Sequence, residues 1–302
     1  MTSQPFHDGE IAVQTRAGVR AMAEKIGHGI HPDIPLVVQA FLREQRMVVV
    51  ASADRRGAVW ASLLCGRRGF ARAVDELTMR VDAAPAAGDP LADTLRPGAR
   101  LGLLAVDFAT RHRMRVNGVV ESVAEGGFVL RAEQVFGNCP KYIQRRELRD
   151  GAIPSSRARL ISDAAQLSRA QRVWIESADT FVIASLHPER GADASHRGGN
   201  PGFVRFIADD TIVWPDYAGN MMFQTLGNLT VNPAAGLLFL DFAAGSTLQL
   251  TGTAKIVWDL DGQPAFAGAE RLVELHVERA IEIADHCPAN WQFIEPSPFN
   301  PR

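Results

Sequence analysis

The chain repeats itself, and this repeat restricts the possible folds more than any other feature. The segment GLLAVDF at 102–108 returns as GLLFLDF at 236–242. Other matched pairs keep the same separation of 133 or 134 residues: Ser62 and Ser195, Gly69 and Gly202, Asp82 and Asp216, Gly118 and Gly252. A constant separation over about seventy positions indicates a tandem duplication. We therefore expect two domains, 1–155 and 156–302, with a polar, turn-rich linker at 149–162.

Each repeat has the same order of expected elements. A helix comes first, at 36–46 in the first repeat and at 163–176 in the second, and another amphipathic helix is expected at 11–26. Short segments rich in Val, Ile, Leu and Phe follow, separated by Gly, Pro and Asp. They lie at 47–53, 59–64, 70–74, 76–82, 99–107 and 112–123, and at 180–186, 192–196, 202–208, 211–214, 234–242 and 246–258. Many short strands with few helices favour a mainly β, barrel-like fold.

The bulk properties narrow the classes of protein. A net charge of −2 gives no support for nucleic-acid binding, which needs a basic surface. No apolar run is long enough for a membrane helix, and the first residues do not resemble a signal peptide. Three cysteines without CxxC spacing predict neither a disulfide framework nor a metal site. We therefore expect a cytoplasmic protein with reduced thiols.

The two repeats have lost opposite sets of polar residues. The second repeat has His196 and Arg197 where the first has leucines, and a polar cluster where the first has mostly lost one. That cluster consists of Asn220, Gln224, Thr225 and Asn228. The first repeat in turn keeps Arg115, Asn117 and Lys141 where the second has Gln249, Thr251 and Ala289. Suppose that the ancestor was a two-fold dimer with two binding sites at its interface. Fusion of the two subunits into one chain would then allow one site, built from residues of both repeats, to be kept while the other lost its binding residues. We predict one working site per chain.

The retained residues suggest an anion pocket. Arg197, the backbone N–H groups of Gly198 and Gly199, and a short helix at 220–229 with Asn220 as N-cap would supply donors. Arg111, Arg113 and Arg115 alternate along the sequence, so on a strand they would share one face. They would form a second set of cationic contacts with an anionic ligand. The pocket would suit a phosphate on a flat ligand, with walls from Trp214, Tyr217, Met221, Met222 and Phe223.

The segment SHRGGNPGFVRF, the run WPDYAGNMMFQTLGNLTVNPAAGLLFLDF and the later motifs RMRVNG and FGNCPKYIQRR resemble the pyridoxamine 5'-phosphate oxidase-like FMN-binding split-barrel family. The similarity is greatest to its uncharacterised flavin-nucleotide-binding branch. It implies two tandem split β-barrels, FMN at the interface between repeats, and redox chemistry at the flavin. It places Arg197, Gln224 and Thr225 at the phosphate, and Ser195, His196 and Asn220 beside the flavin or its ribityl chain. The family's usual Arg/Lys pair on the helix is replaced here by Gln224 and Thr225, and the substrate-binding arginine motif of true pyridoxamine phosphate oxidases is missing from the last residues.

The expected function is that of an FMN-dependent oxidoreductase acting with a small-molecule redox substrate or a partner reductase, and a homodimer is left open. Two alternatives remain: a non-catalytic flavin or haem binding or storage protein, and a deazaflavin-dependent reductase. No catalytic residue is assigned. The expected cofactor-binding residues are Ser195, His196, Arg197, Gly198, Gly199, Asn220, Phe223, Gln224, Thr225, Asn228, Arg115, Asn117, Asn138 and Lys141. The recurring Cys139 and Cys287 are interpreted as structural corners, and RRELR at 145–149 as a solvated helix face.

Overall fold

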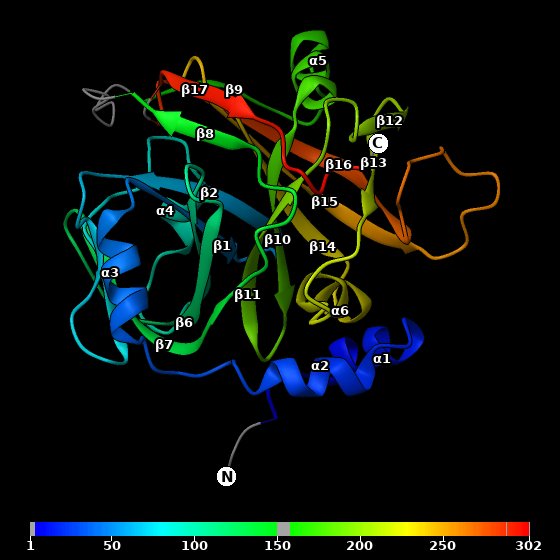
Figure 1. Ribbon diagram of the computed structural model, residues 1–302. Coiled ribbons are helices and arrows are strands. Elements are labelled where there is room, and N and C mark those ends of the chain that lie inside the picture. The colour runs from blue at the N-terminus through cyan, green and yellow to red at the C-terminus, as the bar shows by residue number, and fades with distance from the viewer. Residues whose placement is uncertain (1–3, 150–157, 288, 302) are drawn as a thin grey trace.

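The computed structural model describes residues 4–149, 158–287 and 289–301. The expected boundary at 155/156 and most of the expected linker fall outside the described residues. The fold is mainly β and contains two large sheets, one in each repeat (Figure 1). Among the described residues, no helix is both long enough and apolar enough to cross a membrane.

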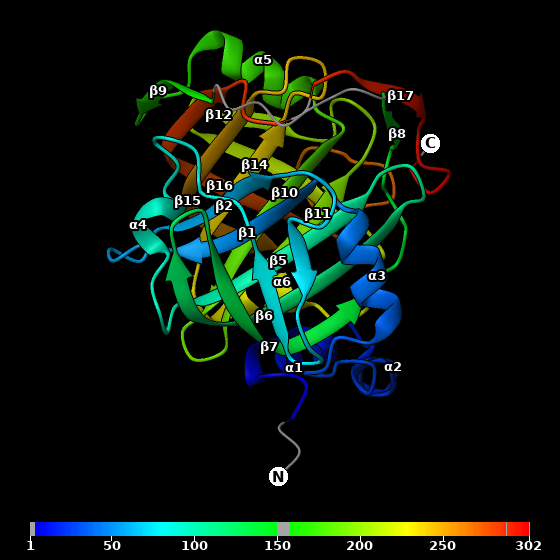
Figure 2. The same ribbon diagram turned by 90° about the vertical axis from the view of Figure 1, so that its left-hand side faces the viewer.

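The first repeat forms a seven-stranded sheet in the order β2-β1-β5-β6-β7-β4-β3. Its elements are α3 (Leu36–Glu44), β1 (Met47–Ala53), β2 (Val59–Cys65), β3 (Ala71–Ala73), β4 (Thr78–Val81), α4 (Leu91–Thr94), β5 (Arg100–Asp107), β6 (His112–Ala124) and β7 (Gly127–Gly137). Alternating apolar side chains of these strands fill one core, which α3 helps to cover through Val38 and Leu42. Figure 2 shows α3 beside this sheet.

The second repeat has the same strand order, β11-β10-β14-β15-β16-β13-β12, with β9 paired to β16. Its elements are β9 (Arg159–Ala164), α5 (Arg169–Ser177), β10 (Thr180–His187), β11 (Gly191–Gly198), β12 (Arg205–Ala208), β13 (Thr211–Asp216), α6 (Gln224–Val231), β14 (Ala234–Leu240), β15 (Thr247–Val257) and β16 (Arg271–Ala284). Each strand thus occupies the place of its counterpart in the first repeat, as the sequence repeat predicts. Both repeats also carry a bulge before the matching glycines Gly118 and Gly252.

The repeats face each other through equivalent strands. A Cβ atom on Gly102 of β5 would lie 2.5 Å from the Ala192 carbonyl oxygen on β11. A Cβ atom on Gly236 of β14 would lie 2.5 Å from the Val59 carbonyl oxygen on β2. The two close approaches are related by the repeat, so only glycine fits at either position. A shared apolar core lies between them and includes Leu63, Leu104, Val182 and Leu238.

Four expected details were wrong. The segment 11–26 forms two helices, α1 (Asp8–Arg16) and α2 (Arg20–Gly27), because Gly18 adopts a left-handed φ of 73° between them. The helix expected at 163–176 begins only at Arg169, where Ser168 forms a capping box with Gln171. RRELR is not a helix: β8 (Arg145–Leu148) pairs with β17 (Trp291–Glu295). The long strands β7 and β16 were missed because their charged outer faces lower the apolar content of the segments.

The N-terminal helix α1 packs on the second repeat, while Ala23 of α2 packs with Phe136 of the first repeat and Met222 of the second. Figure 1 shows α1 and α2 together at one end of the molecule, next to α6. The contact between α1 and α6 is close, since a Cβ atom on Gly9 would lie 2.4 Å from the Gly227 carbonyl oxygen. Gln14 of α1 donates a hydrogen bond to the Met222 carbonyl oxygen (2.8 Å). Chain from the first repeat thereby supports the segment that leads into α6.

Candidate functional site

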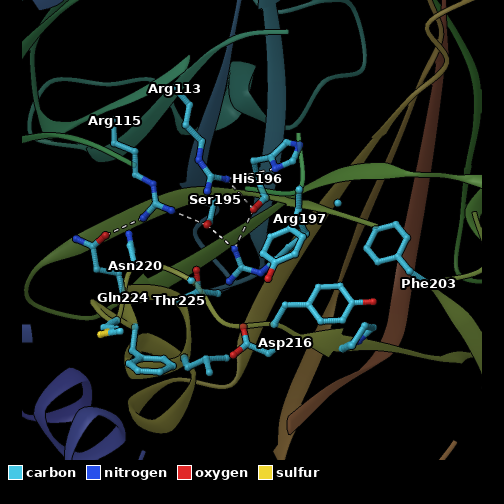
Figure 3. Close-up of a pocket in the computed structure, with 18 residues that line it drawn as sticks. Arg113, Arg115, Ser195, His196, Arg197, Phe203, Asp216, Asn220, Gln224 and Thr225 are labelled. Carbon is cyan, nitrogen blue, oxygen red and sulfur yellow. Dashed lines mark hydrogen bonds between the residues drawn. The ribbon is translucent and has the colours of Figure 1, made fainter. Parts of the chain in front are cut away.

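A pocket lies between the two repeats (Figure 3). The first repeat contributes β6 and the segment after β7, and the second contributes β11, the end of β13 and the start of α6. The enclosed cavity measures about 90 Å³. Most ligand sites are several times larger, so this space suits a phosphate-sized group rather than a whole nucleotide.

Three arginines meet in the pocket. Arg113 and Arg115 alternate on β6 and therefore point to the same face, while Arg197 comes from β11 of the other repeat. Figure 3 shows all three directed toward Ser195 and His196. The predicted convergence on one site thus includes Arg113 and Arg115, whereas Arg111 turns away. Arg111 instead contacts Glu295 (3.1 Å) and the Ile143 carbonyl oxygen (3.0 Å).

Both terminal nitrogens of Arg115 are engaged by protein groups, whereas its buried Nε atom has no hydrogen-bond partner among the described residues. Its Nη1 atom lies 3.0 and 3.1 Å from the two carboxylate oxygens of Asp193 and donates to the Gln224 Oε1 atom (2.7 Å). Its Nη2 atom donates to the Ser195 hydroxyl. Asn117 also donates to Asp193 (3.2 Å), so this carboxylate is held from two sides. Both members of the ion pair are about 5 % exposed or less, and such a buried pair needs the full set of hydrogen bonds that surrounds it.

Arg113 and Arg197 are not neutralised in this way. Neither has a described carboxylate within 4 Å. Arg113 Nη1 lies 3.3 Å from both the Nδ1 atom and the carbonyl oxygen of His196. Arg197 donates to the Ser195 hydroxyl and to the His196 carbonyl oxygen. Burial, followed by repulsion from Arg115 and Arg197, lowers the pKa of Arg113 to about 9. Two cations thus share a small space that an anion would stabilise.

His196 is a neutral side chain in this environment. Burial, together with Arg113 and Arg197, holds its pKa well below the usual range. A guanidinium can only donate, so the Nδ1 atom facing Arg113 must accept and the proton must lie on Nε2. Nε2 is buried and has no partner among the described residues. A neutral imidazole of this kind cannot serve as a proton donor at neutral pH in the way an imidazolium would.

The start of α6 differs from the expected helix. We predicted a helix from Asn220 with Asn220 as its N-cap, but α6 begins at Gln224. Phe223 occupies the N-cap position with a left-handed φ of 60°, and no side chain caps the first turn. Asn220 instead accepts from the Met222 backbone N–H (3.1 Å) and shapes the preceding loop. Gln224 and Thr225, the first two residues of α6, line the pocket, and their backbone N–H groups have no acceptor within the helix.

Nine of the fourteen expected residues line the pocket, and five do not. The nine are Ser195, His196, Arg197, Gly198, Asn220, Phe223, Gln224, Thr225 and Arg115. Asn117 and Asn228 line a smaller cavity behind α6, where Asn228 contacts His7 (2.9 Å) and Ser185 (3.0 Å). Gly199, Asn138 and Lys141 lie outside both cavities; Lys141 donates to the Ala218 carbonyl oxygen (3.4 Å).

Other residues were placed wrongly or missed. Trp214 and Met222 are core residues rather than pocket walls, with 0 % and 4 % exposure. Tyr142 and Asp216 line the pocket but were not among the expected site residues. Asp216 forms an ion pair with the nearly buried Arg271 (3.2 Å), and its charge also acts on Arg197 without a direct ion pair. The sequence did contain a hint about Tyr142: the repeated motif has a tyrosine at this position in the first repeat and Asn290, 148 residues later, in the second.

The two recurring cysteines lie outside the pocket. The Cys139 sulfur accepts from the Lys141 backbone N–H (3.4 Å), which fits a corner. Cys287 packs in the core between the repeats, and burial raises its pKa to about 12. Pro288, which follows it in the repeated motif, lies outside the described residues.

The equivalent location in the other half is closed. Gln249 stands where Arg115 stands, and its Nε2 atom donates to the Ala61 carbonyl oxygen (3.0 Å), Ser62 (3.1 Å) and Asp89 (3.2 Å). Ser62 also donates to Asp89 (2.6 Å). Leu63 and Leu64 replace His196 and Arg197 and are fully buried. Gln249, Ser62 and the Asp89 carboxyl group are hydrogen-bonded to one another there, and leucines stand in place of His196 and Arg197, so these positions form no cationic pocket.

Comparison with known proteins relates part of the chain to a known family. Residues 167–286 match the family model described as pyridoxamine 5'-phosphate oxidase. The match spans most of the second repeat, which is therefore similar to the pyridoxamine 5'-phosphate oxidase family. This agrees with the resemblance in the sequence and with the two split-barrel sheets. The matched segment includes β11, the end of β13 and α6, which are the parts that this split-barrel repeat contributes to the pocket.

Solved structures with related folds are distant. HupZ of Group A Streptococcus is 16 % identical, covers 41 % of this chain and 99 % of its own, and has a TM-score of 0.32. A FAD-binding protein of Mesorhizobium loti is 10 % identical, covers 42 % of this chain and 98 % of its own, and has a TM-score of 0.30. A search of the curated proteins finds no match to the chain.

Proposed function

We propose that the pocket binds FMN through its phosphate and that the protein is an FMN-dependent oxidoreductase with one FMN held between repeats 1–155 and 156–302. The observation that carries the proposal is a pair of cations, Arg113 and Arg197, that have no carboxylate within 4 Å among the described residues and line the same pocket as the uncapped start of α6. A phosphate dianion would compensate both charges and accept from free N–H groups. The similarity of the second repeat to this family adds support from the fold.

The residues present fit a flavin phosphate in two further respects. The cavity of about 90 Å³ accommodates a phosphoryl group, and the rest of the ligand would extend toward Tyr142 and Tyr217 at its mouth. Neutral His196 orients Arg113 without adding a third uncompensated cation. When bound, the flavin would supply the electron-transfer chemistry. The chain would bind and orient the flavin; the redox substrate would be a small molecule or a partner reductase.

The first test replaces Arg197 by Gln and titrates the cofactor-free protein with FMN. We expect binding weaker by roughly 10- to 100-fold, because a charge-assisted hydrogen bond contributes on the order of 1.5–3 kcal/mol. Arg67→Gln is the matched control, since Arg67 is an exposed arginine of the first repeat outside the pocket. Equal losses in both variants, or none in Arg197→Gln, would contradict the phosphate assignment.

NADH and NADPH oxidation by the FMN-loaded protein would then distinguish an oxidoreductase from a carrier.

A further inference from the structure

The chain has only two tyrosines, and both lie at the mouth of the arginine pocket. Tyr142 comes from the first repeat and Tyr217 from the second. Their ring centroids are 5.0 Å apart, with 33° between the ring planes. The Tyr142 hydroxyl donates to the Ala218 carbonyl oxygen (3.1 Å), so the pair connects the repeats across the opening.

Tyr142 adopts an unfavourable backbone conformation. Its φ is 66°, in the left-handed region that bulky side chains rarely occupy. The equivalent position in the second repeat is Asn290, whose φ is 70°. Asparagine enters this region readily, because its short polar side chain tolerates it. The backbone shape is therefore common to both repeats, and the first repeat alone places a ring on it.

The surrounding structure holds this conformation in place. The Tyr142 backbone N–H donates to the Ser297 hydroxyl (3.1 Å), and the Ser297 backbone N–H donates to Gln144 (2.8 Å). The ring itself does not belong to any of the buried apolar cores among the described residues. Strain that is maintained without a gain in core packing points to a role at the adjoining site.

We propose that Tyr142 is a specificity-determining contact residue, whose ring packs against the flat ring system of the ligand that the arginine pocket holds by its phosphate. The inference rests on the proposed FMN site. Both tyrosines line the same pocket as the three arginines, so the ring system of a ligand held there by its phosphate would meet the tyrosine pair. Tyr142 would thereby favour aromatic phosphate esters over other phosphates, whereas the arginines bind both.

The test compares FMN with inorganic phosphate in the cofactor-free full chain. Tyr142→Asn introduces the residue that the second repeat carries at this position. We expect FMN binding about five- to tenfold weaker, the usual contribution of an aromatic contact. Competition by inorganic phosphate should not change. Tyr142→Phe keeps the ring and should stay within about twofold of the natural protein, while Tyr142→Leu should lose FMN affinity as Asn does.

The reverse exchange is the matched control. Asn290→Tyr places a ring on the same backbone shape away from the pocket, so the Tm should fall and FMN affinity should not change. The Tm of Tyr142→Asn should equal or exceed that of the natural protein, because the backbone strain is relieved. If Tyr142→Asn does not fold, the Phe and Leu variants decide between ring contact and bulk.

Two results would overturn the inference. One is equal FMN affinity of the natural protein and the Asn and Leu variants. The other is an equal loss of FMN and inorganic phosphate binding, since Tyr142 would then support the arginine pocket rather than contact the ring. Failure of the natural protein to bind FMN is a separate outcome, and it would instead contradict the proposed function.

Discussion

Glu10 is a carboxyl group buried directly behind the arginine pocket. It is 3 % exposed and accepts a hydrogen bond from the His7 backbone N–H (2.8 Å). Burial raises its pKa from 4.5 to about 8, and the charge of nearby Asp193 adds to the effect. His7, which lies 3.4 Å away, is kept neutral because burial lowers its pKa to about 4. This contact at neutral pH is therefore a polar contact between uncharged groups rather than an ion pair.

Replacement of Glu10 by Gln tests this protonation state. The folded chain retains the Glu10 proton up to about pH 8, whereas the unfolded chain releases it near pH 4.5, so the natural protein loses stability as pH rises between these values. Glu10→Gln removes that dependence. The free energy of unfolding of the variant, relative to the natural protein, should rise by about 1.4 kcal/mol per pH unit and level off above pH 8.

Urea unfolding at pH 5, 6, 7 and 8 measures the difference. Glu24→Gln on the exposed face of α2 is the control and should give a constant difference at all four values. A constant difference for Glu10→Gln as well would show that Glu10 is ionised throughout this range.

At the scale of elements, the contact between α1 and α6 sets the position of the first turn of α6. A Cβ atom on Gly227 would lie 2.6 Å from the Glu10 backbone nitrogen, which cannot yield without moving the helix. Gln224 and Thr225 lie one turn earlier on α6 and line the pocket. Packing of an N-terminal helix on α6 is therefore coupled to the geometry of the pocket.

Gly227→Ala should destabilise the protein by about 1–3 kcal/mol, the usual cost of overpacking. Helix propensity alone would predict a gain of up to about 1 kcal/mol, so the sign separates the two effects. The measurement is the urea midpoint. Gly137→Ala is the control, because its nearest new contact is the flexible Met114 side chain at 3.4 Å. A more stable Gly227→Ala variant would mean that the two helices separate at little cost.

At the scale of the whole molecule, two sites related by the repeat have diverged. One has three arginines, and the other has Gln249, Ser62 and Asp89 bonded to one another. We predict a stoichiometry of one FMN per chain, measured from the flavin absorbance against the protein concentration. The side chains of the closed site have no unpaired cation that a phosphate would stabilise. Two FMN molecules per chain would show that the closed site still binds the cofactor, even if Arg197 proved essential for binding at the arginine pocket.

The sequence alone was sufficient for the general architecture. Apolar segments such as 99–107 and 234–242 lie close to β5 and β14, because alternation and turn residues are local signals. The constant separation of the repeats predicted the same succession of elements in both, because similar sequences form similar local structure. Family resemblance pointed to the segment from Ser195 to Asn228, and the pocket includes most of the residues expected there.

Only the tertiary structure decided which charges remain free. Arg113, Arg115 and Arg197 are the same kind of residue in the sequence. Arg115 pairs with Asp193, 78 residues away, whereas the other two have no carboxylate within 4 Å in the part of the chain that the structure describes. The start of α6 was also beyond local reasoning, because Phe223 takes a left-handed conformation that its own side chain disfavours. The ion pair of Arg115 joins the two repeats, so it forms only when the repeats pack together.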